Sequence, residues 1–523
     1  MHESESPEPL PLALPETIPE PVAAVSNAEP VPSLSLTLRR FLHILILLFS
    51  LFLLVRTIFL EPFGVTTGSM AETIHGNRRE LPCPRCGYTV CIGSMDEARG
   101  GYNPQETGIC PNCALTKLNI SKVDETFGDR LLVDKFAFRT RNPHRWEVAV
   151  FRCPDDDRNG SNKRSRDTIS AAEARLPFED DRKPYVKRVV GLPNEKIRIF
   201  DGDIYIDGAI QRKSLDQVRA MRIPFFEIDS APQPDGWGLR FEIGPVLGAT
   251  KLPNAEQKTL PTISEVLKGN ELVLDGTERP FGLTYRHRDF DSKKDEVVRD
   301  WLGYNGAIRR ETAPVHDFIV ECEVEATGSG VFACRLGDGA DTVKLDLPIG
   351  EAGEAVIAHE NGVERLIPKA FLKPGKKTKL EFAFVDRRVF FAIDGKEFAE
   401  PLDLPPLKDP SVKRNGLDRP VQFGIRGASL TIRHLMLYRD IHYRSEEGKH
   451  ATRSEYRLGA DEYFVLGDNS ANSRDSREWD IPGVPERDFL GKPFWVHQPL
   501  RMGQLPILGR VQTIDWTRFR ALE

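Results

Sequence analysis

The sequence predicts a mainly β protein with a single N-terminal transmembrane helix. Residues 38–60 include a predominantly apolar stretch from Phe41 to Leu60, interrupted by His43 and Arg56, and about 20 apolar residues can cross a bilayer as a helix. Beyond this stretch, short β-rich runs recur between turn signals such as the Asp-Gly pairs at 201–202 and 207–208, which is typical of antiparallel strands. The net charge of −6 gives no overall basic character that would indicate nucleic-acid binding.

The segment before the helix, residues 1–37, is rich in Pro, Glu, Ala and Ser and has no aromatic residue. Such a composition cannot bury enough apolar surface to fold, so we expect a disordered tail. Arg39 and Arg40 at the start of the helix favour a cytoplasmic N-terminus. The apolar core is too long for a cleaved signal peptide, and no Ala-x-Ala-like site follows it. We therefore expect an uncleaved single-pass anchor in the cytoplasmic membrane, with everything after residue 61 extracytoplasmic.

A β meander is expected to follow in three separate pieces, residues 61–76, 127–212 and 446–523. Its strands are predicted around 128–136, 147–151, 184–191, 197–208 and 463–466. Two other regions, residues 77–126 and 213–445, interrupt these pieces. The highly charged stretch from Cys153 to Arg182 is interpreted as a solvated loop.

The second interruption, residues 213–445, is predicted to contain a β-sandwich. Val320, Cys322 and Val324 alternate with glutamates, as strands with one buried face do. The pattern resembles the concanavalin and laminin-G type of jelly roll, although it carries no motif. Such folds often bind carbohydrate, but many only decorate a larger protein, so carbohydrate binding stays open. If residues 327–330 form a hairpin turn, Cys322 and Cys334 point to opposite faces, and no disulfide is expected between them.

The first interruption, residues 77–126, contains two C-x-x-C knuckles. They are formed by Cys83, Cys86, Cys110 and Cys113. Four thiolates at this spacing predict a structural zinc site of the ribbon type, which has no open position for catalysis. Disulfides, or a ribbon that has lost its metal, are the alternatives.

Ser69 lies only about nine residues past the apolar stretch, close to the expected membrane surface. A serine hydroxyl becomes a good nucleophile only when a base removes its proton. None of the 11 histidines has a suitable context, and Ser69 lacks the G-x-S-x-G pattern. A lysine can serve instead when burial lowers its pKa by several units, and Lys187 lies in a strand-like run between Tyr185-Val186 and Val189-Val190.

Several segments then recur in one order along the chain. They are Glu61-Pro62-Phe63, Thr67-Gly68-Ser69-Met70, Gly128-Asp129 with Leu132-Val133-Asp134-Lys135-Phe136, Lys187-Arg188-Val189-Val190-Gly191-Leu192-Pro193, Gly467-Asp468-Asn469 with Ser473, Asp475, Ser476 and Arg477, and Gly491-Lys492-Pro493-Phe494-Trp495-Val496. Their order and spacing resemble those of bacterial type I signal peptidase (leader peptidase). The similar segments cover roughly a third of the chain.

The resemblance implies a role for each matching residue. Ser69 would be the nucleophile and Lys187 the general base. The Thr67 hydroxyl, with the Ser69 backbone N–H, would stabilise the oxyanion, and Ser473 would orient the Lys187 amine. The remaining residues near the site would be structural, with Met70 lining it and Asp475 and Arg477 forming an ion pair.

Two departures from the family pattern concern the surroundings of the site. Ala71-Glu72-Thr73 lacks the proline that the family often has after the methionine, and Ser470 stands where the family commonly has arginine. Every position with an implied catalytic role keeps a suitable side chain. The departures therefore leave the rate and the fine specificity open.

The resemblance implies a membrane-anchored serine endopeptidase that removes signal peptides from exported precursors through an acyl-enzyme, without a catalytic cofactor. Its partners would be those signal peptides, the lipid bilayer and the secretion translocon. Two alternatives remain, a Ser/Lys self-cleaving regulator and an inactive surface-binding protein on the same scaffold. The sequence does not indicate which precursors are cut, what the sandwich binds, whether the cysteines hold zinc in vivo, or the oligomeric state.

Overall fold

The computed structural model describes residues 33–522 apart from 97–100, 103–105, 155–182, 233–235, 246–259, 307–310, 361, 363, 408, 410, 447 and 506–508. The chain forms two compact units, Met1–Ile58 and Phe59–Glu523. Most of the predicted disordered tail and most of the predicted charged loop lie outside the described residues.

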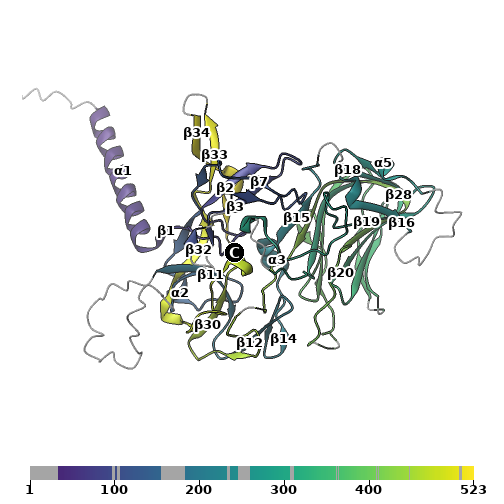
Figure 1. Ribbon diagram of the computed structural model, residues 1–523. Coiled ribbons are helices and arrows are strands. Elements are labelled where there is room, and N and C mark those ends of the chain that lie inside the picture. Colours follow the sequence, from purple (N-terminus) through teal and green to yellow (C-terminus); the bar gives the residue numbers. More distant parts are fainter. Residues whose placement is uncertain are drawn as a thin grey trace, which may run out of the picture. The chain divides into compact units, whose positions relative to one another are not determined.

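The first unit contains helix α1, Ser33–Ile58, which Figure 1 shows as a single straight helix. It begins at Ser33, five residues before the expected start at residue 38, and ends at Ile58, two residues before the expected end at residue 60. Its apolar side chains are exposed, among them Phe41 at 62% and Leu47 at 68%. No helix within the described part of the chain meets the length and apolarity expected of a membrane span. The transmembrane assignment of residues 38–60 is therefore not confirmed.

An antiparallel sheet, called the central sheet below, lies beside the inserted region in the second unit (Figure 1). Its strands follow the order β1-β9-β32-β10-β11-β30-β31, with β35 beside β32. Their bounds are β1 Leu60–Gly64, β9 Arg130–Asp134, β10 Val148–Arg152, β11 Pro184–Gly191, β30 Glu462–Leu466, β31 Val484–Pro485, β32 Phe489–Val496 and β35 Arg520–Ala521. The strands predicted at 128–136, 147–151, 184–191 and 463–466 are confirmed, and they come from residues 127–212 and 446–523. Residues 61–76 contribute most of β1 to the same sheet.

A smaller antiparallel sheet continues the chain after β11. It has the order β14-β13-β12-β29, with bounds β12 Lys196–Phe200, β13 Asp203–Ile206, β14 Ala209–Ile210 and β29 Tyr456–Arg457. Asp201 and Asp207, with φ of 51° and 49°, and the glycine after each make the tight turns that the Asp-Gly pairs predicted.

Residues 77–126 form short strands around the cysteine knuckles. The bounds are β2 Arg78–Pro82, β3 Thr89–Gly93, β4 Met95–Asp96, β5 Gly101–Tyr102, β6 Thr107–Gly108, β7 Leu118–Asn119 and β8 Glu125–Thr126. Strand β2 pairs with both β3 and β8. Near the C-terminus, β33 (Leu500–Leu505) and β34 (Gly509–Ile514) form a separate hairpin.

The inserted region, residues 213–445, is built around two long antiparallel strands, β20 (Phe318–Gly337) and β28 (Val421–Arg439). The other strands are β15 Ile223–Glu227, β16 Phe241–Gly244, β17 Leu267–Lys268, β18 Glu271–Asp275, β19 Phe281–Tyr285, β21 Thr342–Ile349, β22 Glu354–His359, β23 Glu364–Pro368, β24 Lys377–Val385, β25 Arg388–Ile393, β26 Lys396–Glu397 and β27 Leu402–Asp403. The short helices of the second unit as a whole are α2 Ala137–Thr140, α3 Leu215–Met221 and α5 Ile263–Val266. Its 3-10 turns are η3 Gly238–Arg240, η4 Gly303–Asn305, η5 Ser470–Asn472, η6 Glu486–Asp488 and η7 Trp516–Arg518.

Each long strand serves two halves of the inserted region. The first half of β20 pairs with β24 and the second half with β21. The register between β20 and β28 shifts between Gly328 and Val331, and a Cβ on Gly330 would lie 2.1 Å from the Arg426 carbonyl oxygen. This irregularity lets the strands bend, so that inward-facing residues of both halves share one hydrophobic core. The β-sandwich and its jelly-roll type stay predictions.

The predicted alternation along residues 320–326 is confirmed, since Val320, Cys322 and Val324 are buried. Residues 327–330, however, do not form a hairpin turn, because β20 runs through them. Cys322 and Cys334 consequently lie in the same hydrophobic core, and the expectation that they point to opposite faces was wrong. Both are free thiols.

Buried ion pairs join the first residue of the inserted region to later parts of that region, and join the region to the small sheet. The Lys213 amine lies 2.9 Å from Asp386 and 2.7 Å from Asp440. The Arg414 guanidinium donates to Asp203 of β13 at 2.8 Å. Because breaking one member of a buried pair leaves an uncompensated charge, these contacts hold the two regions in one arrangement.

Candidate active site

Ser69 lies in a tight turn that follows β1. Ser69 is buried, with 3% of its surface exposed. The turn is closed by two main-chain hydrogen bonds, from Ala71 N to Gly68 O at 3.1 Å and from Ile74 N to Met70 O at 2.7 Å. The Ser69 carbonyl oxygen accepts a hydrogen bond of 2.9 Å from Asn469 N. A segment about 400 residues later in the chain therefore fixes the backbone of the predicted nucleophile.

Lys187 occupies the middle of β11 and is fully buried. It pairs with Ala149 of β10, and its amine lies 5.8 Å from the centre of the Tyr185 ring. On the other side of β11, Arg188 pairs with Leu466. Continuing this antiparallel register by one position brings Lys187 opposite Gly467, the first residue after β30.

Gly467 is the point at which the predicted site residues meet. A Cβ on this glycine would lie 2.2 Å from Ser473 Oγ and 2.5 Å from the Ser69 carbonyl oxygen. Both distances are shorter than any real contact, so this position requires glycine. The structure thus brings Ser69 and Ser473 to one point, at the end of the strand that lies beside Lys187.

A buried carboxylate lies behind this point. Asp475 accepts hydrogen bonds from Ser473 Oγ at 2.8 Å and from Gly467 N at 3.1 Å. Arg477 donates to both of its oxygens, each at 2.8 Å. The predicted ion pair between Asp475 and Arg477 is therefore present, and it also fixes the Ser473 hydroxyl.

The electrostatics of Asp475 link it to the lysine. Burial would raise the pKa of Asp475, but the charge and hydrogen bonds of Arg477 outweigh it, and the charge of Lys187 adds to the lowering. The carboxylate therefore stays ionised at neutral pH. Its bidentate contact with Arg477 means that most of its charge is already compensated before Lys187 is considered.

Thr67 and Met70 differ in their surroundings. Thr67 is half-buried, at the position that the family resemblance assigns to oxyanion stabilisation. Met70 is 1% exposed and packs in the core of the central sheet with Leu131, Val133 and Val148. Ser470, which replaces the family's arginine, accepts a hydrogen bond of 2.7 Å from Arg477.

Two residues of the inserted region support the Ser69 turn, Tyr304 by direct contact with Gly68 and Asn305 through Asn469, and no sequence pattern indicated either of them. Asn305 exchanges two hydrogen bonds with Asn469, of 2.9 and 2.7 Å, and the Asn469 amide also donates to the Gly68 carbonyl oxygen at 3.0 Å. The ring of Tyr304 would lie 2.2 Å from a Cβ on Gly68. The inserted region is thus part of the support of the site.

The segment around these two residues reads Trp301-Leu302-Gly303-Tyr304-Asn305-Gly306. It has no strand periodicity, and its glycines and asparagine indicate only a turn. That turn is found as η4, Gly303–Asn305. A turn signal does not reveal what the turn contacts, which is why this contribution could not be predicted.

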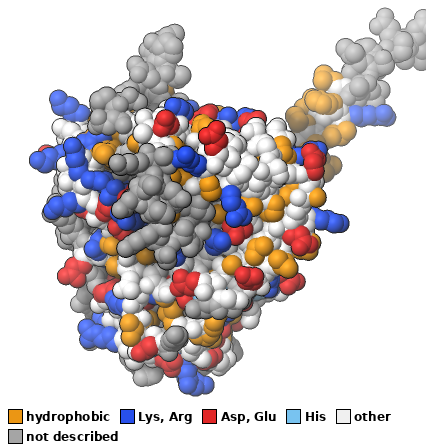
Figure 2. All heavy atoms as spheres, turned by 90° about the vertical axis from the view of Figure 1, so that its right-hand side faces the viewer, with side chains coloured by type: hydrophobic (Ala, Val, Ile, Leu, Met, Phe, Trp, Pro, Cys, Tyr) orange, Lys and Arg blue, Asp and Glu red, His pale blue; other side chains and the backbone are white. Residues whose placement is uncertain are grey.

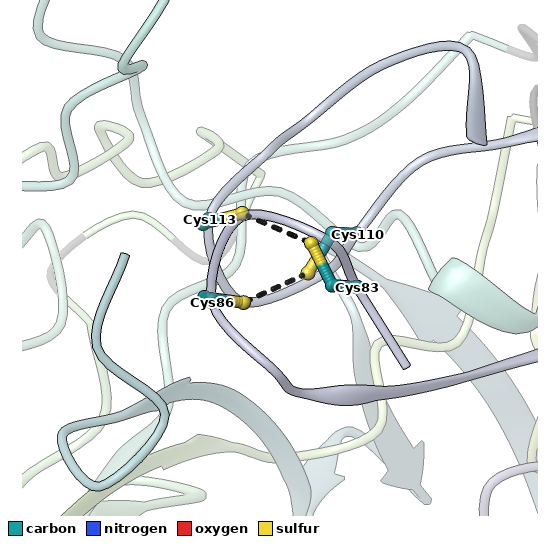
Figure 3. Close-up of side chains that lie close together, drawn as sticks. All are labelled: Cys83, Cys86, Cys110 and Cys113. Carbon is teal, nitrogen blue, oxygen red and sulfur yellow. Dashed lines mark hydrogen bonds between the residues drawn. The ribbon is translucent and has the colours of Figure 1, made fainter. Parts of the chain in front are cut away.

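The four cysteines of the two knuckles also come together, and all are buried (Figure 3). Cys83 Sγ lies 3.6 Å from Cys113 Sγ, and Cys86 Sγ lies 3.7 Å from Cys110 Sγ. All four sulfur atoms lie within 4.8 Å of one another. Four thiolates at about 2.3 Å from a tetrahedral zinc ion would be separated by roughly 3.8 Å, so the donor set and its spacing fit zinc.

The thiols of the cluster shift one another's pKa values in opposite directions. Hydrogen bonds from Cys110 and Cys86 lower the pKa of the Cys113 thiol to about 2. The hydrogen bond with Cys113 is the largest influence raising the pKa of Cys110. A thiolate is the form that binds a metal.

A comparison with family models finds a match to "Signal peptidase, peptidase S26" over residues 120–276 and 391–497, which is just over half of the chain. The chain belongs to this family. The matched residues include Lys187, Ser473, Asp475 and Arg477, whereas Ser69 and the cysteine knuckles precede them. The unmatched interval between them falls inside the inserted region.

Curated relatives agree with the family assignment. Over 107 residues the chain is 30% identical to a probable signal peptidase I-2 from Synechocystis sp., which is 20% of this chain and 38% of that protein. It is 38% identical over 71 residues to a signal peptidase I from Pseudomonas aeruginosa, 12% of this chain and 25% of that protein. The chain therefore spans well under half the length of these relatives.

Among solved structures, the chain has a slight likeness to a Crh5 transglycosylase. It covers 40% of this chain and 81% of that one, with 10% identity and a TM-score of 0.24. A likeness at this level says nothing further about the inserted region.

Proposed function

We propose that this protein is a signal peptidase I, a serine endopeptidase that removes N-terminal signal peptides from exported precursors. The single observation that carries the proposal is the meeting of three distant segments at Gly467. The Ser69 carbonyl and the Ser473 hydroxyl lie against this glycine, and Lys187 is buried in the strand beside it. Family membership independently associates this sheet with peptidases.

In the proposed reaction, the uncharged Lys187 amine takes the proton of the Ser69 hydroxyl as Ser69 Oγ attacks the scissile carbonyl. The Ser69 N–H and the Thr67 hydroxyl stabilise the oxyanion. Lys187 then donates its proton to the leaving amine, which leaves an acyl-enzyme on Ser69. The same amine next activates a water molecule, which releases the signal peptide and regenerates the free serine.

The surroundings of Lys187 support its proposed role. Lys187 is fully buried in the middle of β11. The buried carboxylate of Asp475 accepts hydrogen bonds from Nε and Nη2 of Arg477. Ser473, held by Asp475 at 2.8 Å, is in a position to orient the amine.

Cleavage of a purified model precursor tests the proposal. We expect Ser69→Ala and Lys187→Ala each to abolish cleavage while the protein still folds. Lys196→Ala is the matched control, because Lys196 is exposed at the start of β12. This variant should cleave the precursor as the wild type does. Retained processing by purified Lys187→Ala would refute the dyad.

The proposal places the protein at the cytoplasmic membrane, with the N-terminus inside and the second unit outside, where it would meet precursors leaving the translocon. The exposed apolar side chains of α1 support membrane attachment, and Arg39 and Arg40 support this orientation. Protease protection of residues 59–523 in intact spheroplasts would contradict the orientation, and recovery of the chain free of membranes would contradict the attachment.

We propose further that Cys83, Cys86, Cys110 and Cys113 hold one structural zinc ion. The spacing of their sulfur atoms supports this. Metal analysis with thiol titration should find one zinc per chain, which is lost in Cys83→Ser and kept in Cys91→Ser. A metal-free protein with four titratable knuckle thiols would refute the proposal. Because four cysteines leave no open coordination position, this zinc would not take part in catalysis.

A further inference from the structure

A cavity of ≈ 410 Å³ lies between the cysteine-bearing segment and the inserted region. Pro111 lines it from the first, and Phe225, Val298 and Leu302 line it from the second. Its volume is in the range of pockets that bind small molecules, and such pockets combine apolar walls with a few polar groups. Neither the family match nor the proposed function gives this cavity a role.

Arg240 is the unusual polar group of the cavity. The residue is 1% exposed. Its Nη1 donates to the Tyr285 hydroxyl at 2.6 Å and lies 3.2 Å from His287 Nδ1. Its Nε has no hydrogen-bond acceptor, and no acidic side chain in the described part of the chain forms an ion pair with it. A buried charge without a counter-charge is costly, because burial removes its hydration.

The groups around Arg240 do not compensate its charge. Burial, and then the charge of Arg240, lower the pKa of His287 well below its usual range, so the imidazole is neutral. The Phe290 ring lies 5.4 Å from the guanidinium carbon and offers a π face but no anion. Arg439, which also lines the cavity, is satisfied instead by the main-chain oxygens of Asp440 and Asp300.

The acidic side chains that line the cavity form no ion pair with Arg240. Asp289 accepts a hydrogen bond from Ser292 N in its own loop, Glu296 is exposed, and Glu72 lies 3.3 Å from His75 Nε2. Arg240 therefore remains as a buried donor group that faces an apolar space and lacks an anion.

We propose that this cavity binds a small amphipathic carboxylate. The carboxylate would accept hydrogen bonds from the Arg240 guanidinium, whose planar donors match its two oxygens. The apolar body would lie against Pro111, Phe225 and Val298. Glu72 also lines the cavity, and it lies three residues after Ser69, so a bound ligand would touch the segment that carries the proposed nucleophile.

Calorimetric titration of the full-length chain with 2-naphthoate and with 2-naphthamide tests the proposal. The two probes have nearly the same shape, but only naphthoate carries a negative charge, so uptake by detergent or by an apolar surface would not favour naphthoate. We expect naphthoate to bind on the order of 10- to 100-fold more tightly than naphthamide. Absence of binding, or equal affinity for the two probes, would overturn the proposal.

Two variants locate the binding. Arg240→Gln should remove the preference for naphthoate. Arg286→Gln is the matched control, because Arg286 is a neighbouring arginine that pairs with Asp295 at 2.6 Å and does not line the cavity; it should keep the preference. An unchanged preference in Arg240→Gln would place the anion elsewhere and overturn the proposal. If Arg240→Gln does not fold, protection of Arg240 from a guanidinium-modifying dione by naphthoate, but not by naphthamide, decides the question.

Discussion

The proposed active site and the cysteine cluster are both buried groups of polar side chains, but they are assembled in opposite ways. The four cysteines come from two knuckles within residues 83–113, a short stretch of the chain, and their sulfur atoms lie within 4.8 Å of one another. The proposed active site takes Ser69, Lys187 and Ser473 from three distant segments, and Asn305 from a fourth. The first cluster depends on local geometry, whereas the second depends on the whole of the central sheet and on the inserted region.

Within the inserted region, the exposed surface and the buried side also differ. In the space-filling view of its face, acidic and basic side chains are interspersed, with apolar groups between them (Figure 2). The structure supports a functional contribution of this region on its buried side, where Tyr304 contacts Gly68 of the Ser69 turn and Asn305 binds Asn469.

The largest effect is expected at Gly467, where the distant segments meet. Gly467→Ala places a methyl group 2.2 Å from Ser473 Oγ and 2.5 Å from the Ser69 carbonyl oxygen, so at least one of them must move. Because a displacement of about 1 Å can cost about 100-fold in rate, we expect precursor cleavage to fall by about 100-fold or more. Gly64→Ala, whose added Cβ would meet nothing within 4 Å, should cleave normally. Normal cleavage by Gly467→Ala would show that Ser69 and Ser473 need not lie at this point.

A smaller effect is expected when the inserted region loses its contact with the site. Asn305→Ala removes the donor and the acceptor that face Asn469, and we expect about 10-fold slower turnover with a stability loss of about 1–2 kcal/mol. Asn305→Asp should be worse, because its second carboxylate oxygen would face the Asn469 oxygen. Turnover numbers and thermal unfolding of the two variants check this order. Equal activity of the wild type and both variants would show that the Asn305 contact of the inserted region does not contribute to catalysis.

The cysteine cluster should respond differently, since it is assembled locally. Cys83→Ser, or removal of metal by a chelator, should lower the temperature of unfolding and expose the remaining knuckle thiols. We expect cleavage at a permissive temperature to change by less than about 3-fold, because no ligand touches the reacting atoms. Thermal unfolding and cleavage measured on the same samples test this, and a loss as large as that of Gly467→Ala would mean that the two clusters are not independent.

The smallest effect concerns Glu147, the residue directly before β10 of the central sheet. Burial would raise the pKa of Glu147, but hydrogen bonds from Arg141 and Lys492 and from the His144 backbone lower it to about 2. Since the folded-state pKa lies below the unfolded value of about 4.3, ionised Glu147 stabilises the fold above that value, and this contribution disappears as the pH falls toward 2. Glu147→Gln should therefore unfold at a lower temperature than the wild type at pH 7, and the difference should shrink below pH 4. A difference that is independent of pH would rule out this ion pair as its source.

How much could be predicted from the sequence follows the same division. Strand patterns located β10 and β11, because short apolar runs between turn residues depend on neighbours in the chain. The knuckle spacing located the cysteine cluster for the same reason. Order along the chain, compared with a known family, was needed to associate Ser69 with Lys187, and Asn305 escaped both approaches because its partner Asn469 is 164 residues away and no pattern marks the pair. The bend of β20 at Gly330 was also missed, since Thr-Gly-Ser-Gly indicates a turn and does not distinguish a hairpin from an irregularity within one strand.

The central claim is that the Lys187 amine activates the Ser69 hydroxyl. Intact-protein and peptide mass spectrometry after treatment with a serine-reactive acylating inhibitor tests it most directly. The account predicts one adduct, on Ser69, at the same rate in the wild type and in Lys196→Ala, and no adduct in Ser69→Ala or Lys187→Ala. An adduct on a different serine, or undiminished labelling of Ser69 in folded Lys187→Ala, would contradict it.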